Sequence, residues 1–160
     1  MKKMTHLLAG LCLGLMLLQY ADDSVATNAA VTRDYSDAMA DEKARNYFTD
    51  TEVIDQNGKK LRFYSDVLKG RVVLISFIFT NCEYACPMQA QKLKQARAAM
   101  VPAIKDDVWY VSLSVDPERD TPEAMKKFAE RQGVDENRWI FLTGEKKNME
   151  FLVKRLGQYT

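Results

Sequence analysis

Apolar side chains occupy both faces of the segment Val72–Phe79 (VVLISFIF), and most of them are β-branched or aromatic. This pattern predicts a strand that is buried on both sides, as in a parallel sheet. Two further apolar segments, Val108–Val115 and Trp139–Leu142, predict a second and a shorter third strand. Ahead of them, an Asn57-Gly58 turn favours a hairpin between Glu52–Asp55 and Lys59–Phe63, because Asn-Gly tolerates positive φ.

Apolar positions also recur at helical spacing between and after these strands. Residues 87–101 are predicted to be helical, and a second helix begins with Thr121 as N-cap and Pro122 at its first position and ends at Gly133. A third helix has apolar residues at i, i+3, i+4 and i+7, namely Met149, Leu152, Val153 and Leu156. Strand and helix alternate, which predicts an α/β fold with helices on both faces of a sheet.

The N-terminal part of the chain has a different pattern. Two lysines precede a continuous apolar run over Leu7–Leu18, which at twelve residues is shorter than the roughly 20 that a membrane-spanning helix needs. We therefore expect an export signal or an N-terminal anchor in residues 1–26. The polar residues 27–46 predict a linker with a short helix near its end, followed by a domain over residues 47–160.

Composition narrows the function classes. The 160 residues carry 23 Lys and Arg against 22 Asp and Glu, a formal charge of +1, which argues against a polybasic nucleic-acid binder. The chain has three cysteines and one histidine. Cleavage of an export signal would remove Cys12 and His6 and leave Cys82 and Cys86 with no histidine.

Cys82 and Cys86 lie in a loop between the first buried strand and its helix. Open α/β sheets bind ligands at this carboxyl end of the strands. Since Pro87 lacks an N–H, we expect it to be the first helical residue and Cys86 to be the N-cap. Free N–H groups and the positive helix end would then lower the pKa of the cysteine thiol in the loop.

Two thiols in one short loop have three uses that the residues alone leave open. They can bind a soft ion such as Cu(I), cycle between dithiol and disulfide, or form a static disulfide. A static bridge across so short a loop removes little chain entropy. Zinc fits less well because its sites need three or four ligands, and Cys–His nucleophilic catalysis would lack its base.

A second polar segment, Ser114–Pro122, follows the next strand. Asp116 is a candidate for a hydrogen-bond acceptor behind the cysteine loop, or for a weak ligand. Asp120 is explained here, with Thr121 and Pro122, as part of a turn and a helix cap. Tyr84 is expected to be exposed beside the cysteines, where it would line a partner site or only pack on the helix flank.

The segments Phe77–Pro87 (FIFTNCEYACP) and Ser112–Pro122 (SLSVDPERDTP) together resemble the Sco/SenC family of thioredoxin-like copper proteins. Phe141–Gly144 (FLTG) also matches, and the similarity runs from about Phe48 to the end of the chain. Thioredoxin-fold redox proteins usually carry C-x-x-C. The additional residue between the cysteines and the second motif make this resemblance specific.

The resemblance implies a periplasmic or membrane-associated protein that delivers copper to the binuclear copper centre of a haem–copper oxidase, or reduces the cysteines of that centre. In the family the cysteines that match Cys82 and Cys86 bind copper together with a later histidine, whose position lies beyond Thr160. Two further strands and a last helix also follow that point in the family. We therefore expect a thioredoxin-like fold that lacks them, with Val72–Phe79 at the sheet edge, in the N-terminal part of a longer protein.

Two functions of different classes follow. One is a copper metallochaperone without turnover, and the other is a periplasmic thiol–disulfide oxidoreductase that uses Cys82 and Cys86 as a redox pair. The expected partner is the copper subunit of cytochrome oxidase or another exported protein with cysteines, and no nucleic acid is expected. A thiol peroxidase would need a base that the sequence does not offer near the cysteines.

Overall fold

A computed structural model of the chain describes residues 37–101, 107–134 and 137–158. The chain divides into two compact units, Met1–Lys43 and Ala44–Thr160. The described residues of the first unit, 37–43, are helical, and this helix ends at residue 48. The expected export signal over residues 1–26 lies outside the described residues, and the proposed division into signal, linker and domain stays a prediction.

The second unit is built on a five-stranded sheet with the order β2-β1-β5-β4-β3. The strands are β1 (Glu52–Asp55), β2 (Lys60–Arg62), β3 (Val72–Ile78), β4 (Val108–Ser114) and β5 (Trp139–Thr143). The strands β3, β4 and β5 run parallel, and β1 pairs antiparallel with both β2 and β5. The predicted hairpin and all three predicted strands are therefore confirmed.

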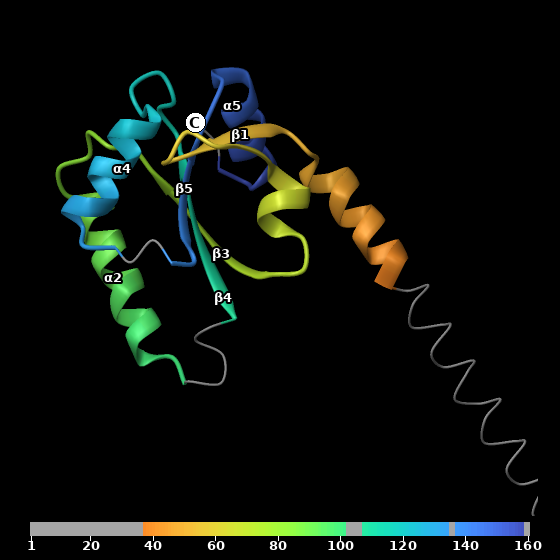
Figure 1. Cartoon of the computed structure of the whole chain (residues 1–160), viewed down its shortest axis with the longest axis horizontal. Helices are drawn as coiled ribbons and strands as arrows, with labels where there is room; N and C mark the ends of the chain where they lie inside the picture. Colours follow the sequence, from red (N-terminus) through yellow and green to blue (C-terminus); the bar gives the residue numbers. More distant parts are fainter. Residues whose placement is uncertain (1–36, 102–106, 135–136, 159–160) are drawn as a thin grey trace, which may run out of the picture. The chain divides into compact units, whose positions relative to one another are not determined.

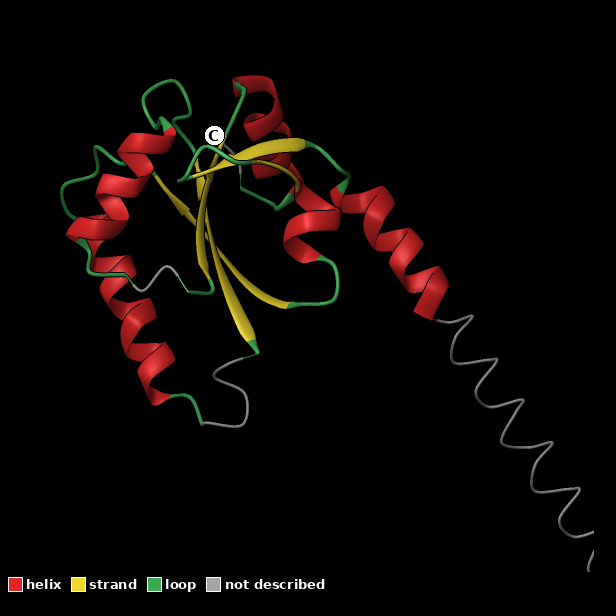
Figure 2. Cartoon of the chain, in the orientation of Figure 1, coloured by secondary structure: helices red, strands yellow, loops and turns green. Residues whose placement is uncertain are grey.

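Helices cover both faces of this sheet (Figures 1 and 2). They are the π-type helix η1 (Phe63–Leu68) and the α-helices α2 (Ala85–Ala99), α4 (Pro122–Arg131) and α5 (Lys146–Arg155). Buried side chains of α2 and α4 share one core cluster with Trp139 and Phe141 of β5. Those of η1 and α5 share the other with Val111 and Leu113 of β4. The α/β architecture expected from the alternation of strands and helices is confirmed.

The predicted turn chemistry is also present. Gly58 in the hairpin has a φ of 81°, which L side chains rarely adopt. The Thr121 hydroxyl caps α4 by accepting a hydrogen bond from the Ala124 N–H at 3.3 Å. Gly133 follows α4 with a φ of 58°. Local sequence signals therefore predicted this turn and both ends of α4 correctly.

Strand β3 is less buried than its sequence suggests. Among the described residues it pairs only with β4, so it forms an edge of the sheet. Only Ser76 and Ile78 are buried, and Val72 is 64% exposed. For the described residues, the edge position expected from the family resemblance is confirmed, and the prediction of a strand buried on both faces is wrong. An apolar run predicts a strand, but the burial of that strand depends on neighbours elsewhere in the chain.

The register of the parallel strands determines where the functional loops lie. Ile78, the last residue of β3, is the partner of Ser114, the last residue of β4. The Val115 N–H then donates to the Ile78 carbonyl at 2.9 Å. Because both strands end at the same level, the loops that follow them meet at one edge of the sheet.

Within the described residues, no helix has the length and apolarity needed to cross a membrane.

The edge position of β3 leads to a prediction about amide exchange. Every second β3 amide points away from β4, and we expect these amides to exchange with solvent far faster than those of β4, which is paired on both sides. Residue-resolved hydrogen exchange by NMR measures this, with β4 as the internal control. Uniform protection along β3 would contradict the edge assignment, because it would require another strand on that side.

Candidate thiol site

The two cysteines lie at the start of α2. The helix begins at Ala85 with Tyr84 as N-cap, and its first bond runs from the Met88 N–H to the Tyr84 carbonyl at 3.1 Å. The expectation that Cys86 is the N-cap and Pro87 the first helical residue is therefore wrong by two residues. The first four N–H groups of a helix have no acceptor within it, so a proline at the third position costs no hydrogen bond.

The thiols differ in exposure although they are neighbours. Both are free, with Cys82 half-buried and Cys86 only 6% exposed. The Cys86 N–H donates to the Cys82 sulfur at 3.2 Å, and the Cys82 N–H donates to the Phe79 carbonyl at 3.2 Å. Cys86 belongs to the core cluster of α2 and α4, against which Cys82 packs. The site thus has one thiol that solvent reaches and one that the protein covers.

This difference shifts the two pKa values in opposite directions. Backbone N–H groups lower the pKa of the Cys82 thiol, first that of Cys86 and then those of Tyr84 and Ala85, while partial burial opposes them. These are free amides at a helix start, which stabilise a thiolate. Burial raises the pKa of the Cys86 thiol to about 11, with smaller contributions from Cys82 and Asp120. The pair therefore favours a thiolate at Cys82 and a protonated thiol at Cys86.

A buried carboxylate joins the cysteine loop to the loop after β4. Asp120 is 1% exposed and accepts three hydrogen bonds. Its Oδ1 accepts from the Thr80 N–H at 2.8 Å and from the Thr80 hydroxyl at 2.7 Å, and its Oδ2 accepts from the Ser114 hydroxyl at 2.5 Å. The sequence indicated only a turn and helix-cap role for Asp120, and this link was not predicted. The available signal was a hydroxyl after β3 and a carboxylate after β4, since adjacent parallel strands bring such residues together.

Asp116 lies in the same loop but points elsewhere. Its Oδ2 accepts from the Arg119 guanidinium at 2.9 Å, and its N–H donates to the Ser114 hydroxyl at 3.0 Å. Its carbonyl accepts from the N–H groups of Arg119 and Asp120. The structure thus places Asp116 in the turn that holds Asp120, and a direct role toward the thiols stays a prediction.

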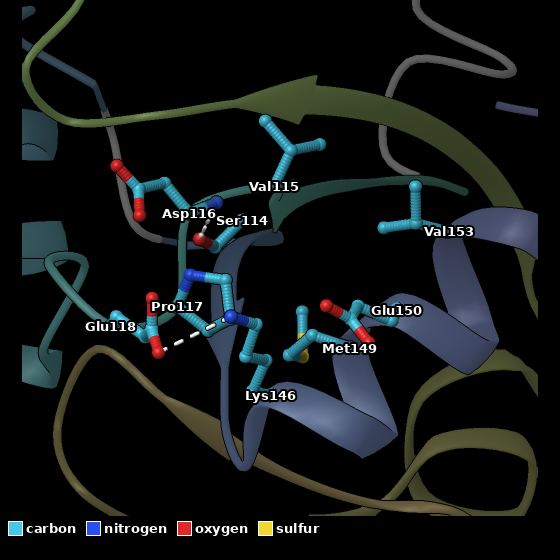
Figure 3. A pocket seen from close by; sticks show the side chains of 9 residues that line it. All are labelled: Ser114, Val115, Asp116, Pro117, Glu118, Lys146, Met149, Glu150 and Val153. Atoms are coloured by element: carbon cyan, nitrogen blue, oxygen red, sulfur yellow. Dashed lines mark hydrogen bonds and ion pairs between the residues drawn. The ribbon is translucent and has the colours of Figure 1, made fainter. Parts of the chain in front are cut away.

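A small cavity lies beyond this loop, between the end of β4 and α5 (Figure 3). Its lining includes Asp116, and the Lys146 ammonium pairs with Glu118 across its rim at 3.3 Å. At about 190 Å³ the cavity is smaller than the roughly 300 Å³ at which small-molecule sites begin. Neither cysteine lines this cavity.

The thiol site can hold a soft ion or form a disulfide. Two adjacent thiols, one of them with a lowered pKa, are ligands that suit Cu(I). Across residues 37–101, 107–134 and 137–158, no three His, Cys, Asp or Glu side chains form a group that could hold a metal ion. The described residues therefore offer two sulfur ligands, which fit a soft monovalent ion better than a four-coordinate zinc.

The comparisons with known proteins agree on one family. The family described as SCO1/SenC matches residues 39–160. The "SCO1 protein homolog" of Bacillus subtilis is 42% identical over 90 residues, which cover 56% of this chain and 45% of the relative. A "putative copper-binding protein" of Stutzerimonas stutzeri is 31% identical over 106 residues, 66% of this chain and 50% of the relative. The chain thus spans about half the length of the curated relatives it matches.

Solved structures give the same fold. Bradyrhizobium japonicum ScoI, solved with copper bound, matches with a TM-score of 0.56 and 31% identity, over 66% of this chain and 63% of that one. BsSco, described as having a disulfide switch and as a member of a family of cytochrome c oxidase assembly proteins, matches with a TM-score of 0.54 and 36% identity. That match covers 65% of this chain and 59% of BsSco. The thioredoxin-like fold expected from the sequence is confirmed.

The two thiols should titrate in separate steps. In a Cys12→Ser background, thiolate absorbance should rise first below the ordinary cysteine pKa and again near pH 11. In Cys82→Ser the remaining step should occur below pH 11, because Cys82 contributes to the raised pKa of Cys86. Two thiols that titrate together near their ordinary pKa would contradict the asymmetry.

Asp120 and Asp116 form a matched pair for mutation. Asp120→Asn should lower the free energy of unfolding by about 2–3 kcal/mol, since charged acceptors of buried hydrogen bonds contribute most. Asp116→Asn should cost at most about 1 kcal/mol, because its ion pair is exposed. Urea unfolding of the reduced proteins measures both, and equal losses would contradict the linking role of Asp120.

Proposed function

The chain belongs to the SCO1/SenC family, and from that premise we propose that it is a copper metallochaperone that carries Cu(I) on Cys82 and Cys86. The observation that carries this proposal is the hydrogen bond at the start of α2 that joins the two cysteines, in which the Cys86 N–H donates to the Cys82 sulfur at 3.2 Å. Thiolates are soft ligands that select Cu(I). Copper is here a cargo that the protein takes up and hands on.

The names of similar proteins support copper as the cargo. Bradyrhizobium japonicum ScoI was solved with copper bound, and the Stutzerimonas stutzeri relative is named a putative copper-binding protein. The description of BsSco places its family in cytochrome c oxidase assembly. We therefore propose delivery to the copper subunit of a haem–copper oxidase in the periplasm, with the N-terminal residues 1–26 as export signal or membrane anchor.

The asymmetry of the thiols suits uptake and release. Cys82 is accessible and has a lowered pKa, so it offers a thiolate to an incoming ion. Cys86 is buried and has a raised pKa, so its proton must leave when it becomes the second ligand. A buried ligand without the ion is thus held in the protonated form. Release begins most easily at Cys82, because only this sulfur is open to a competing thiol.

A thiol–disulfide oxidoreductase is the second candidate, and the same asymmetry supports it. The Cys82 thiolate would attack one sulfur of a partner disulfide and form a mixed disulfide, while the other partner sulfur leaves as a thiolate. Cys86 would then attack the Cys82 sulfur, and its proton would pass to the released partner thiolates. The products are a reduced partner and an oxidised Cys82–Cys86 pair. The disulfide switch described for BsSco agrees with such chemistry.

Copper titration tests the primary proposal. The reduced full chain should bind one Cu(I) in competition with a chromophoric chelator, and Cys82→Ser or Cys86→Ser should each weaken binding by more than about 100-fold. Removing a direct ligand should reduce the copper affinity by more than the 10–100-fold that is typical when a residue supporting a ligand is removed. Cys12→Ser is the matched control and should bind as tightly as the parent chain.

Retention of full affinity in either variant of the Cys82–Cys86 pair would place the copper site elsewhere. The second candidate is separated from the first by turnover. Repeated reduction of a partner disulfide by a copper-free chain, supplied with a thiol reductant, would favour the oxidoreductase.

A further inference from the structure

Large apolar side chains are exposed around the accessible thiol. Phe79 is 37% exposed, Tyr84 81% and Met88 57%. All three lie within ten residues of sequence that also hold both cysteines. The other large apolar side chains exposed in the described residues are scattered over the N-terminal helix, the start of β3, the end of α2 and α5: Met39, Tyr47, Val72, Val101 and Phe151. Phe79, Tyr84 and Met88 are thus the exposed large apolar side chains that lie closest in sequence to the two cysteines.

Backbone contacts fix this apolar rim, defined as Phe79, Tyr84 and Met88, next to Cys82. The Phe79 carbonyl accepts a hydrogen bond from the Cys82 N–H at 3.2 Å, and Tyr84 follows Cys82 by two residues. Met88 follows Tyr84 by one helical turn, with its N–H bonded to the Tyr84 carbonyl at 3.1 Å. Residues at this spacing lie on the same helix face. The three exposed side chains of the apolar rim therefore belong to the loop and the first helical turn that also carry Cys82 and Cys86.

Packing within the domain does not require these side chains. Helix α2 buries only Cys86 and Ala90, and Met88 lies outside both core clusters. The same exposed face continues to Lys92, one turn after Met88, and α2 contains basic but no acidic residues. Glu83 is exposed between Cys82 and Tyr84, so the positive charge lies only on the far side of Met88. This order of an apolar side chain and then a basic one is complementary to an apolar group followed by an acidic one.

We propose that the apolar rim and Lys92 form the docking surface for a cysteine-bearing loop of the partner protein. The loop would carry an apolar side chain next to its cysteine, to cover Tyr84 and Met88, and an acidic side chain placed to reach Lys92. This inference rests on the proposed function, because both copper transfer and thiol exchange bring a partner cysteine to Cys82. Cys86 is buried and Cys82 is not, so a partner cysteine meets Cys82 first.

Thiol exchange with short peptides tests the docking surface without copper. Each of three peptides carries one cysteine as a mixed disulfide with thionitrobenzoate. The residues that flank this cysteine are Leu and Glu in the first peptide, Ser and Glu in the second, and Leu and Lys in the third. The Cys82 thiolate attacks the peptide sulfur and releases the coloured thionitrobenzoate thiolate. With the full chain in a Cys12→Ser background, the Leu–Glu peptide should react about tenfold faster than the Ser–Glu peptide, as expected for burial of one apolar side chain.

Variants locate the preference on the rim. Met88→Gln should reduce the Leu-over-Ser preference to less than threefold and leave the rate with a small aromatic disulfide unchanged. Lys92→Glu should reverse the preference between the Leu–Glu and Leu–Lys peptides. Phe151→Gln, an exposed apolar residue on α5, is the matched control and should keep both preferences. Circular dichroism and thermal melting confirm that each variant is folded.

Three results would overturn the inference: equal rates for the Leu and Ser peptides, a full preference in Met88→Gln, or a loss of preference in Phe151→Gln. A concentration-dependent dimer that Met88→Gln abolishes would also overturn it, because a second copy would then occupy the rim. Chelator competition separates this test from the proposed function. Failure of copper binding with intact peptide preference would refute the chaperone and leave the docking surface in place.

Discussion

The buried carboxylate of Asp120 is the interaction on which the site depends. It holds the Thr80 backbone and hydroxyl on one side and the Ser114 hydroxyl on the other. An ionised carboxylate with almost no exposure is costly unless every oxygen is paired, and here three donors satisfy it. The link therefore fixes the loop that leads to Cys82 against the loop that follows β4.

The parallel sheet creates the conditions for this link. Ile78 and Ser114 end their strands in register, so the loops that follow start side by side. The cysteine loop then turns directly into α2, where the Cys86 N–H donates to the Cys82 sulfur and backbone N–H groups lower the pKa of that thiol. Cys86 is the second residue of α2 and lies in the core cluster of α2 and α4. The result is a pair of unlike thiols on neighbouring residues, joined by the hydrogen bond from the Cys86 N–H to the Cys82 sulfur.

Local signals in the sequence predicted much of this arrangement. The apolar runs, the Asn57-Gly58 turn and the Thr121 cap gave the element order, and the two cysteines were placed at the correct end of β3. Contacts between residues far apart in sequence were not predicted. The hydrogen bond from Thr80 to Asp120 joins residues 40 positions apart. No pattern in the residues around Asp120 distinguishes it from an ordinary turn residue. The prediction that β3 is buried on both faces was wrong for the same reason, because the burial of a strand depends on which strands pair with it.

The central claim is that a copper ion binds to the sulfur atoms of Cys82 and Cys86, and X-ray absorption at the copper edge tests it most directly. The measurement uses the full chain in a Cys12→Ser background, reduced and loaded with one equivalent of Cu(I). The account predicts that two sulfur atoms dominate the first coordination shell. A first shell of nitrogen and oxygen atoms alone, or a protein that loses its copper on gel filtration, would contradict it.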